Sequence, residues 1–156
     1  MLALVTIGLG ESTVMSRRGM LGGVGALAAA ALTGCSVLRK DRAELITEEV
    51  SSIDGVSGAK LKTGRDNRFH TYVVGMVDID AASSAEGFRV YDEVMRTAVT
   101  VLHERDEPEV KVGGLNGRLP DGTEITAVEL DPDMPTEDFP LELVSAESLF
   151  PRYGLD

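Results

Sequence analysis

The stretch FHTYVVGMVDIDAASSAEGFRVYDEVMRTAVTVL, residues 69–102, changes its hydrophobic period once and thereby decides the fold class. Up to Asp80 the apolar side chains alternate as they do in a β-strand. Beyond Ser83 they recur with the period of a helix, and Ser83 followed by Glu86 is the capping-box pattern of a helix start. A strand followed closely by a long amphipathic helix predicts a domain in which helices pack on a sheet.

The predicted strand at 69–80 has two faces, and neither is strictly polar. One face carries Phe69, Thr71, Val73, Gly75, Val77 and Ile79, and the other carries His70, Tyr72, Val74, Met76 and Asp78. Apolar residues on both faces predict a central strand. If no helix covers the second face, Tyr72, Val74 and Met76 form an exposed apolar patch and are candidate binding residues.

Shorter patterns on either side complete the expected order of elements. Apolar residues at helical spacing predict a first helix that ends near residue 53, and Pro108 ends the long helix. Further expected elements are strands at 59–62, 110–119 and 124–130, turns at 63–68 and 120–123, and a last helix at 146–150. The predicted fold class is α+β: a two-layer sandwich whose four-stranded, mainly antiparallel sheet carries two helices on one face, in the order α-β-β-α-β-β plus a short C-terminal helix.

The N-terminal segment has the pattern of an export signal. Arg17 and Arg18 precede an apolar run from Met20 to Leu32, and the only cysteine of the chain, Cys35, follows Gly34. A positive start, a short apolar run and small residues at its end are typical of a secretory signal peptide. The run is shorter than the about 20 apolar residues that a membrane-spanning helix needs.

The sequence Leu32-Thr33-Gly34-Cys35 resembles the lipobox of bacterial lipoprotein precursors, which is a Leu, two small or uncharged residues and then Cys. This resemblance implies that the Cys35 sulfur receives a diacylglycerol and that the peptide is cut before Cys35. The mature chain would then be held by lipid at the outer face of the cytoplasmic membrane, or at an outer membrane where the source has one. The alternative is a free, buried Cys35 in an uncleaved anchor helix.

The segment Ser16-Arg17-Arg18-Gly19-Met20-Leu21 also resembles the twin-arginine export motif, although Met20 stands where that motif has Phe or Leu. Basic residues directly after Cys35 oppose the alternative Sec pathway, which stays open. Residues 1–14 form a second apolar run that a signal peptide does not need, so we expect Met15 to be the true start. The predicted regions are a signal peptide at 1–34, a lipidated tether at 35–43, the α+β domain at 44–130, and an acidic, Pro-rich loop with a C-terminal helix at 131–156 that packs on the domain.

Composition excludes several classes of partner. The formal net charge of −11 repels nucleic-acid phosphates, so a nucleic-acid partner is not expected. Trp is absent and aromatic residues make up 4% of the chain, which disfavours a stacking platform for bases or sugars. A single cysteine can form neither an intramolecular disulfide nor a cysteine-based zinc cluster.

No catalytic constellation stands out in the sequence. His70 and His103 would need to converge with a carboxylate to bind a metal, and surface histidines are the simpler interpretation. The acidic stretch DPDMPTED at 131–138 lacks the ligand spacing of a calcium loop. The segment GGLNG at 113–117 has no following helix, so its glycines are expected to permit close approach along the sheet. We therefore expect no enzyme, cofactor or metal.

The helix near 43–53 and the strand YVVGMVDID also resemble, faintly, the BON domain of bacterial envelope proteins, which implies architecture and not function. Two functions are expected from these patterns. The first is a lipoprotein that presents a small non-enzymatic interaction domain to an envelope protein, with membrane lipid bound through Cys35. The alternative is a lipoprotein that binds a lipid or a cell-wall-related ligand in an apolar cleft.

Overall fold

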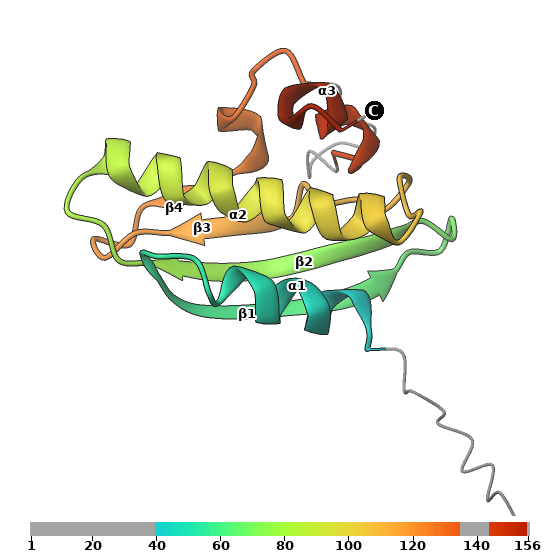
Figure 1. The fold of residues 1–156 in the computed structure, drawn as a ribbon, viewed down its shortest axis with the longest axis horizontal. Helices are drawn as coiled ribbons and strands as arrows, with labels where there is room; N and C mark the ends of the chain where they lie inside the picture. The colour runs from blue at the N-terminus through green and yellow to red at the C-terminus, as the bar shows by residue number, and fades with distance from the viewer. Residues whose placement is uncertain (1–39, 135–143, 156) are drawn as a thin grey trace, which may run out of the picture. The chain divides into compact units, whose positions relative to one another are not determined.

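The computed structural model describes residues 40–134 and 144–155, all within the compact unit that runs from Ser36 to Asp156. Figure 1 shows the order of the elements, which are α1 (Arg42–Val50), β1 (Val56–Arg65), β2 (Thr71–Ile79), α2 (Ser84–Glu104), β3 (Leu115–Arg118), β4 (Glu124–Ile125), the 3-10 turns η1 (Ala127–Glu129) and η2 (Glu147–Leu149), and α3 (Phe150–Tyr153). The prediction of an α+β fold is confirmed.

The sheet has the strand order β1-β2-β3-β4 and is mixed. β1 and β2 form an antiparallel hairpin, as do β3 and β4, whereas β2 and β3 are parallel. The parallel pair arises because α2 carries the chain back to the edge of the sheet at which β2 began. Two of the three strand pairs are antiparallel, so the prediction of a mainly antiparallel sheet is confirmed, although the parallel central pair was not itself predicted.

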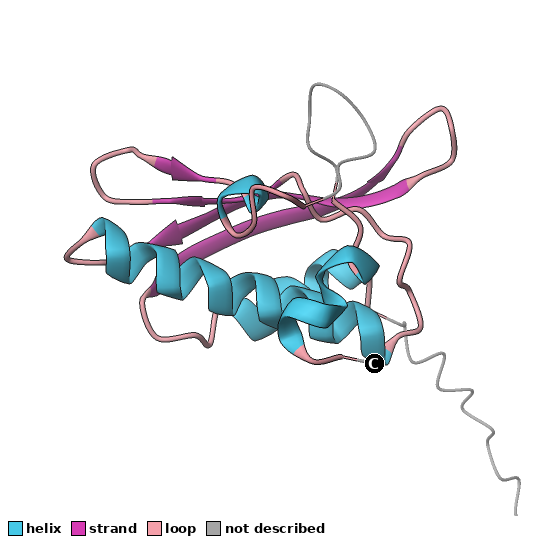
Figure 2. Cartoon of the chain, turned by 90° about the horizontal axis from the view of Figure 1, so that it is seen from above, coloured by secondary structure: helices cyan, strands magenta, loops and turns pink. Residues whose placement is uncertain are grey.

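Helices α1 and α2 lie on the same side of the sheet, and no helix lies flat against its other side in the described part of the chain (Figure 2). Between helices and sheet lies a single hydrophobic core. Its fully buried side chains come from every layer and include Ile46 and Val50 of α1, Val73 and Val77 of β2, Tyr91, Met95 and Leu102 of α2, and Leu115 of β3. The alternation of the sequence thus separates the core face of β2 from its open face.

Helix α1 begins at a capping box that also ties the helix to the sheet. The Asp41 carboxylate accepts a hydrogen bond from the backbone N–H of Ala43 at 3.2 Å, and the Glu44 carboxylate accepts one from the N–H of Asp41. The Thr63 hydroxyl of β1 donates to the same Asp41 carboxylate at 2.6 Å. Partial burial acts to raise the Asp41 pKa, but the hydrogen bonds from Thr63 and Ala43 outweigh it and hold the pKa below its usual value.

Helix α2 packs on the sheet through Tyr91, which is completely buried. Its hydroxyl donates to the Leu115 carbonyl oxygen at 2.7 Å, which satisfies the only polar group of the side chain. A Cβ added to Gly117 of β3 would lie 2.9 Å from the Tyr91 ring, so this glycine makes room for the ring. Burial is the main cause that raises the pKa of the Tyr91 hydroxyl far above its ordinary value.

The middle of β2 needs a glycine. Gly75 has φ +150°, and a Cβ at this position would lie 2.0 Å from the Lys60 carbonyl oxygen of β1. The contact could not be relieved by the movement of a flexible side chain, because the Lys60 carbonyl belongs to the backbone and is held in the β1–β2 ladder.

Several predicted elements differ in length. The expected strand at 110–119 is a bridge at Lys111 followed by β3, because Val112–Gly114 turns away from the regular ladder. The expected strand at 124–130 is the two-residue β4 followed by η1. The C-terminal segment packs on α2, where Arg152 and Tyr153 both bond to the Asp92 carboxylate, at 3.1 and 2.9 Å.

Among the residues that the structure describes, no helix has the length and apolar character to cross a bilayer.

Candidate binding surface

The candidate binding residues Tyr72, Val74 and Met76 lie together on the open face of β2. In the antiparallel register they stand opposite Gly64, Lys62 and Lys60 of β1, and Met76 also stands beside Asn116 of β3. Residues paired in register project from the same face of a sheet. We call this surface, formed by Lys60, Lys62, Tyr72, Val74, Met76 and Asn116, the open face.

The apolar side chains of the open face lie along the sheet and do not stand out from it. A Cβ on Gly64 would fall 2.1 Å from the Tyr72 ring, and a Cβ on Gly114 would fall 2.5 Å from a Val74 methyl group. These two glycines therefore let the Tyr72 and Val74 side chains lie flat over the neighbouring backbone. As a result Tyr72, Val74 and Met76 are each partly exposed, neither buried in the core nor fully open to solvent.

Cations border this apolar row. Lys60 and Lys62 are exposed on β1, and their register places them beside Met76 and Val74. This positive edge stands out on a chain whose formal net charge is −11. A partner that presents apolar side chains next to carboxylates would therefore complement the open face.

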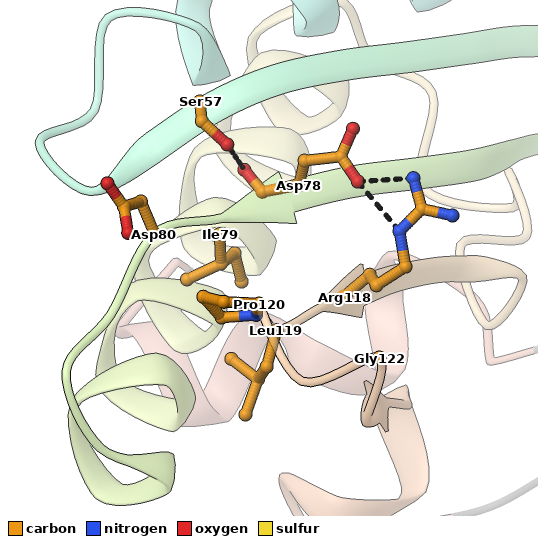
Figure 3. A pocket seen from close by; sticks show the side chains of 8 residues that line it. All are labelled: Ser57, Asp78, Ile79, Asp80, Arg118, Leu119, Pro120 and Gly122. Carbon is orange, nitrogen blue, oxygen red and sulfur yellow. Dashed lines mark hydrogen bonds and ion pairs between the residues drawn. The ribbon is translucent and has the colours of Figure 1, made fainter.

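At the end of the same face, Asp78 of β2 and Arg118 of β3 form an ion pair. The Asp78 carboxylate accepts from the Arg118 Nε at 2.8 Å and from Nη2 at 2.5 Å. Figure 3 shows the two side chains facing each other across the parallel strands, with the Ser57 hydroxyl donating to the Asp78 carbonyl at 3.1 Å. Because both groups are partly exposed, the pair orders this end of the face more than it stabilises the fold.

A solvent-open pocket of about 400 Å³ adjoins that ion pair (Figure 3). It is lined by Ser57, Asp78, Ile79, Asp80, Arg118, Leu119, Pro120 and Gly122. The lining mixes apolar and charged groups, and the Arg118 guanidinium already has a carboxylate partner. The pocket offers polar contacts to a small molecule, but it has no nucleophile paired with a base.

The two histidines have separate local partners. His70 lies in the turn between β1 and β2, where its Nδ1 is 3.1 Å from the Asp66 carboxylate. His103 lies in the last turn of α2 and packs edge-on against Phe150, with ring centroids 4.9 Å apart. In the described residues, no group of three His, Cys, Asp or Glu side chains is placed to hold a metal ion.

Some sequence-predicted residues lie outside the described part of the chain. These are Arg17, Arg18, Leu32, Gly34 and Cys35 of the predicted export signal, and residues 135–143, which take in most of the predicted acidic loop.

Phe69 has a position that the alternation of the sequence did not predict. It was expected in the strand, on the same face as Val73 and Val77, but β2 begins at Thr71 and Phe69 lies in the preceding turn with φ +68°. Its side chain is 78% exposed, and it is the one large hydrophobic side chain that is exposed in the described residues. A bulky residue in the left-handed region is strained and uncommon.

The turn that holds Phe69 is organised by Asp66. One Asp66 carboxylate oxygen accepts from the backbone N–H of Arg68 at 2.9 Å and of His70 at 2.8 Å, and the Phe69 N–H donates to the Asp66 carbonyl at 3.1 Å. Partial desolvation acts to raise the Asp66 pKa, but these hydrogen bonds outweigh it and lower the pKa. The result is a three-residue hairpin loop whose last residue, Phe69, takes the left-handed position that Gly or Asn usually fills.

Comparison of the chain with protein-family models, with curated proteins and with solved structures returns no match.

Proposed function

We propose that this chain is an exported lipoprotein, held by lipid at Cys35 outside the cytoplasmic membrane, whose non-enzymatic domain binds an acidic envelope protein through the open face. The observation that supports this proposal best is the open face itself. It joins an apolar row to a lysine border on the side of the sheet that no described helix covers (Figure 2).

The charge distribution fits a protein partner better than a bare anion. Lys60 and Lys62 stand opposite the apolar side chains Met76 and Val74 in the register of the hairpin. A protein surface can fill the apolar row and place carboxylates beside both lysines at the same time. The lipid anchor would keep such a partner at the membrane surface.

A second candidate function is the binding of a small cell-wall-related ligand, which the pocket beside Asp78 and Arg118 supports. Its mixed lining and open mouth suit a polar ligand, whereas a lipid chain needs an enclosed apolar cleft. The two functions involve different residues and can be separated by mutation.

The interaction is tested by charge reversal in cells that make the acylated protein. A photo-crosslinking residue at Asn116 captures the partner in wild type, and Lys60→Glu with Lys62→Glu should abolish this crosslink. Arg89→Glu is the matched control, since Arg89 is exposed on α2, outside the sheet. An equal crosslink in all variants, or dependence on Arg118→Ala alone, would contradict binding by the open face and would favour the pocket.

The anchor is tested separately with Cys35→Ala. We expect this variant to leave the membrane fraction and to lose the gel mobility of the acylated form. Unchanged retention together with unchanged mobility would refute lipidation of Cys35.

A further inference from the structure

The exposed Phe69 is presented by a rigid support. Asp66 fixes the backbone of the turn through bonds to Arg68 and His70, and the Asp66 N–H donates to the His70 carbonyl at 3.1 Å to close the hairpin. A strained left-handed residue persists only where its surroundings over-determine it, and such strain gathers at functional sites. Because Phe69 is also 78% exposed, burial of its side chain contributes little stability to offset the strain in its backbone.

The Phe69 turn lies at the end of the domain where the chain enters from Cys35. The hydrogen bond from Thr63 to Asp41 places the start of α1 beside the last residues of β1, and Figures 1 and 2 both show the β1–β2 turn and the start of α1 at the same end. From the level of Thr63, four residues of extended chain carry the turn about 13 Å further outward.

The length of the tether makes a shared surface geometrically feasible. Six residue steps separate Cys35 from Asp41, so that this stretch spans at most about 21 Å when fully extended. A lipid-bearing Cys35 would therefore keep the bilayer surface within reach of the Phe69 turn. A second contact made by a molecule already held at the surface is intramolecular, which gives even one aromatic side chain a high effective concentration of lipid.

The charges at this end are mixed. Arg65 and Arg68 are exposed in and beside the turn. Glu107 is paired with Arg42 at 3.3 Å, while Asp106 and Glu109 lie exposed nearby in the chain. Net attraction to anionic lipid is therefore small, and the apolar ring has to carry the contact.

We propose that the Phe69 turn is a second membrane contact, in which Phe69 enters the headgroup region of the bilayer that holds the Cys35 lipid and thereby fixes the orientation of the domain. The contact rests on the proposed lipid anchor for its proximity to the bilayer. It leaves the open face accessible, because Tyr72, Val74 and Met76 lie along the side of the hairpin and not at its tip.

The test uses the absence of Trp from the chain. Phe69→Trp introduces a single fluorophore into the acylated protein, which is purified from membranes and reconstituted in phosphatidylcholine vesicles. We expect a blue-shifted emission, several-fold weaker quenching by aqueous acrylamide, and quenching by brominated phosphatidylcholine. Ser84→Trp is the control. Ser84 is exposed at the start of α2, and the length of this 21-residue helix, about 30 Å, separates it from the end of the domain that holds the Phe69 turn. A Trp at this position should stay quenched by acrylamide.

The outcomes separate the two proposals. If Phe69→Trp behaves like Ser84→Trp while Cys35 still retains the protein on vesicles, the second contact is wrong and the anchor stands. If Cys35→Ala leaves membrane retention unchanged, the anchor is wrong, and the Phe69→Trp emission on vesicles still decides whether the turn meets lipid. Phe69→Gly suits the left-handed backbone and provides a folded variant that should lose the contact. In that background, a fluorophore introduced by Arg65→Trp should become fully accessible to acrylamide. Unchanged protection of this fluorophore would also overturn the proposal.

Discussion

The two faces of β2 carry similar residues but have different surroundings. On the inner face Val73 and Val77 are completely buried under the helices, whereas Val74 and Met76 on the outer face remain partly exposed beside lysines. Hydrophobicity is nearly equal on the two faces, so the neighbours decide which one becomes core. An apolar face without a covering layer is then available for a partner.

The largest effect is expected at the residue that lets β1 approach β2. Gly75→Ala would place a Cβ 2.0 Å from the Lys60 carbonyl oxygen, in a backbone conformation that alanine avoids. Strain and overpacking together should destabilise the domain by about 4 kcal/mol, measured by urea unfolding followed by circular dichroism. Gly122→Ala serves as the control, since it has a positive φ but no atom within 4 Å of the added Cβ. A loss no greater than that of the control would contradict the close approach.

A matched pair of substitutions compares the two faces directly. Val77→Ala removes buried methyl groups from the core and should cost about 2 kcal/mol of unfolding free energy. Val74→Ala removes the same atoms from the open face and should cost about 0.5 kcal/mol. Equal losses in urea titrations would mean that the open face is part of a second core.

Alkaline pH tests the burial of Tyr91 on the inner side. Burial, followed by the nearby Tyr153 and Glu129, raises the Tyr91 pKa far above its ordinary value of 10.0. Above about pH 10 the unfolded chain ionises this hydroxyl and the folded chain does not, so stability should fall by about 1.4 kcal/mol per pH unit. Tyr91→Phe should reduce that slope in urea titrations from about pH 9 to pH 11; the remaining slope comes from Tyr153, whose pKa burial also raises. An unchanged slope would show that Tyr91 is reached by solvent.

The smallest expected effect has the opposite sign. Phe69→Gly relieves a left-handed backbone at φ +68° and removes a side chain that makes little contact with the core. We expect the domain to gain about 1 kcal/mol of stability, visible as a higher melting temperature. A loss of stability would show that the Phe69 ring packs on the domain, and would weaken its proposed role at the membrane.

The sequence predicted the elements whose apolar residues recur with a regular period. The alternation separated Val77 from Val74, and the helical period predicted α2; Val77 and Tyr91 both lie in the core, and Ser83 caps α2 as expected. The parallel pairing of β2 with β3 was missed because strand direction depends on how α2 crosses the sheet, which local patterns do not encode. The length of the strand at 110–119 was overestimated for a related reason. A run of apolar residues has the sequence pattern of a strand even where its backbone forms no regular ladder.

The candidate surface was predictable only in part. Alternation brought Tyr72, Val74 and Met76 together, but Lys60 and Lys62 joined them through the register of the hairpin, which depends on the turn. Phe69 was misplaced because a left-handed position is usually marked by Gly or Asn, and position 69 carries neither. The turn at 63–68 was predicted, but the bonds by which Asp66 extends it to His70, and so takes Phe69 out of the strand, could not be read from the sequence.

The bond between Thr63 and Asp41 has a mechanical consequence. For a chain held at Cys35, a pull on the domain is transmitted through Asp41. Asp41 is bonded both to the first turn of α1, through the capping box, and to Thr63 of the edge strand β1. The force is therefore divided at once between a helix and a strand that is paired along its length with β2. Tension at the membrane would draw α1 and β1 together as one unit, and α1 would not be peeled from the sheet by itself.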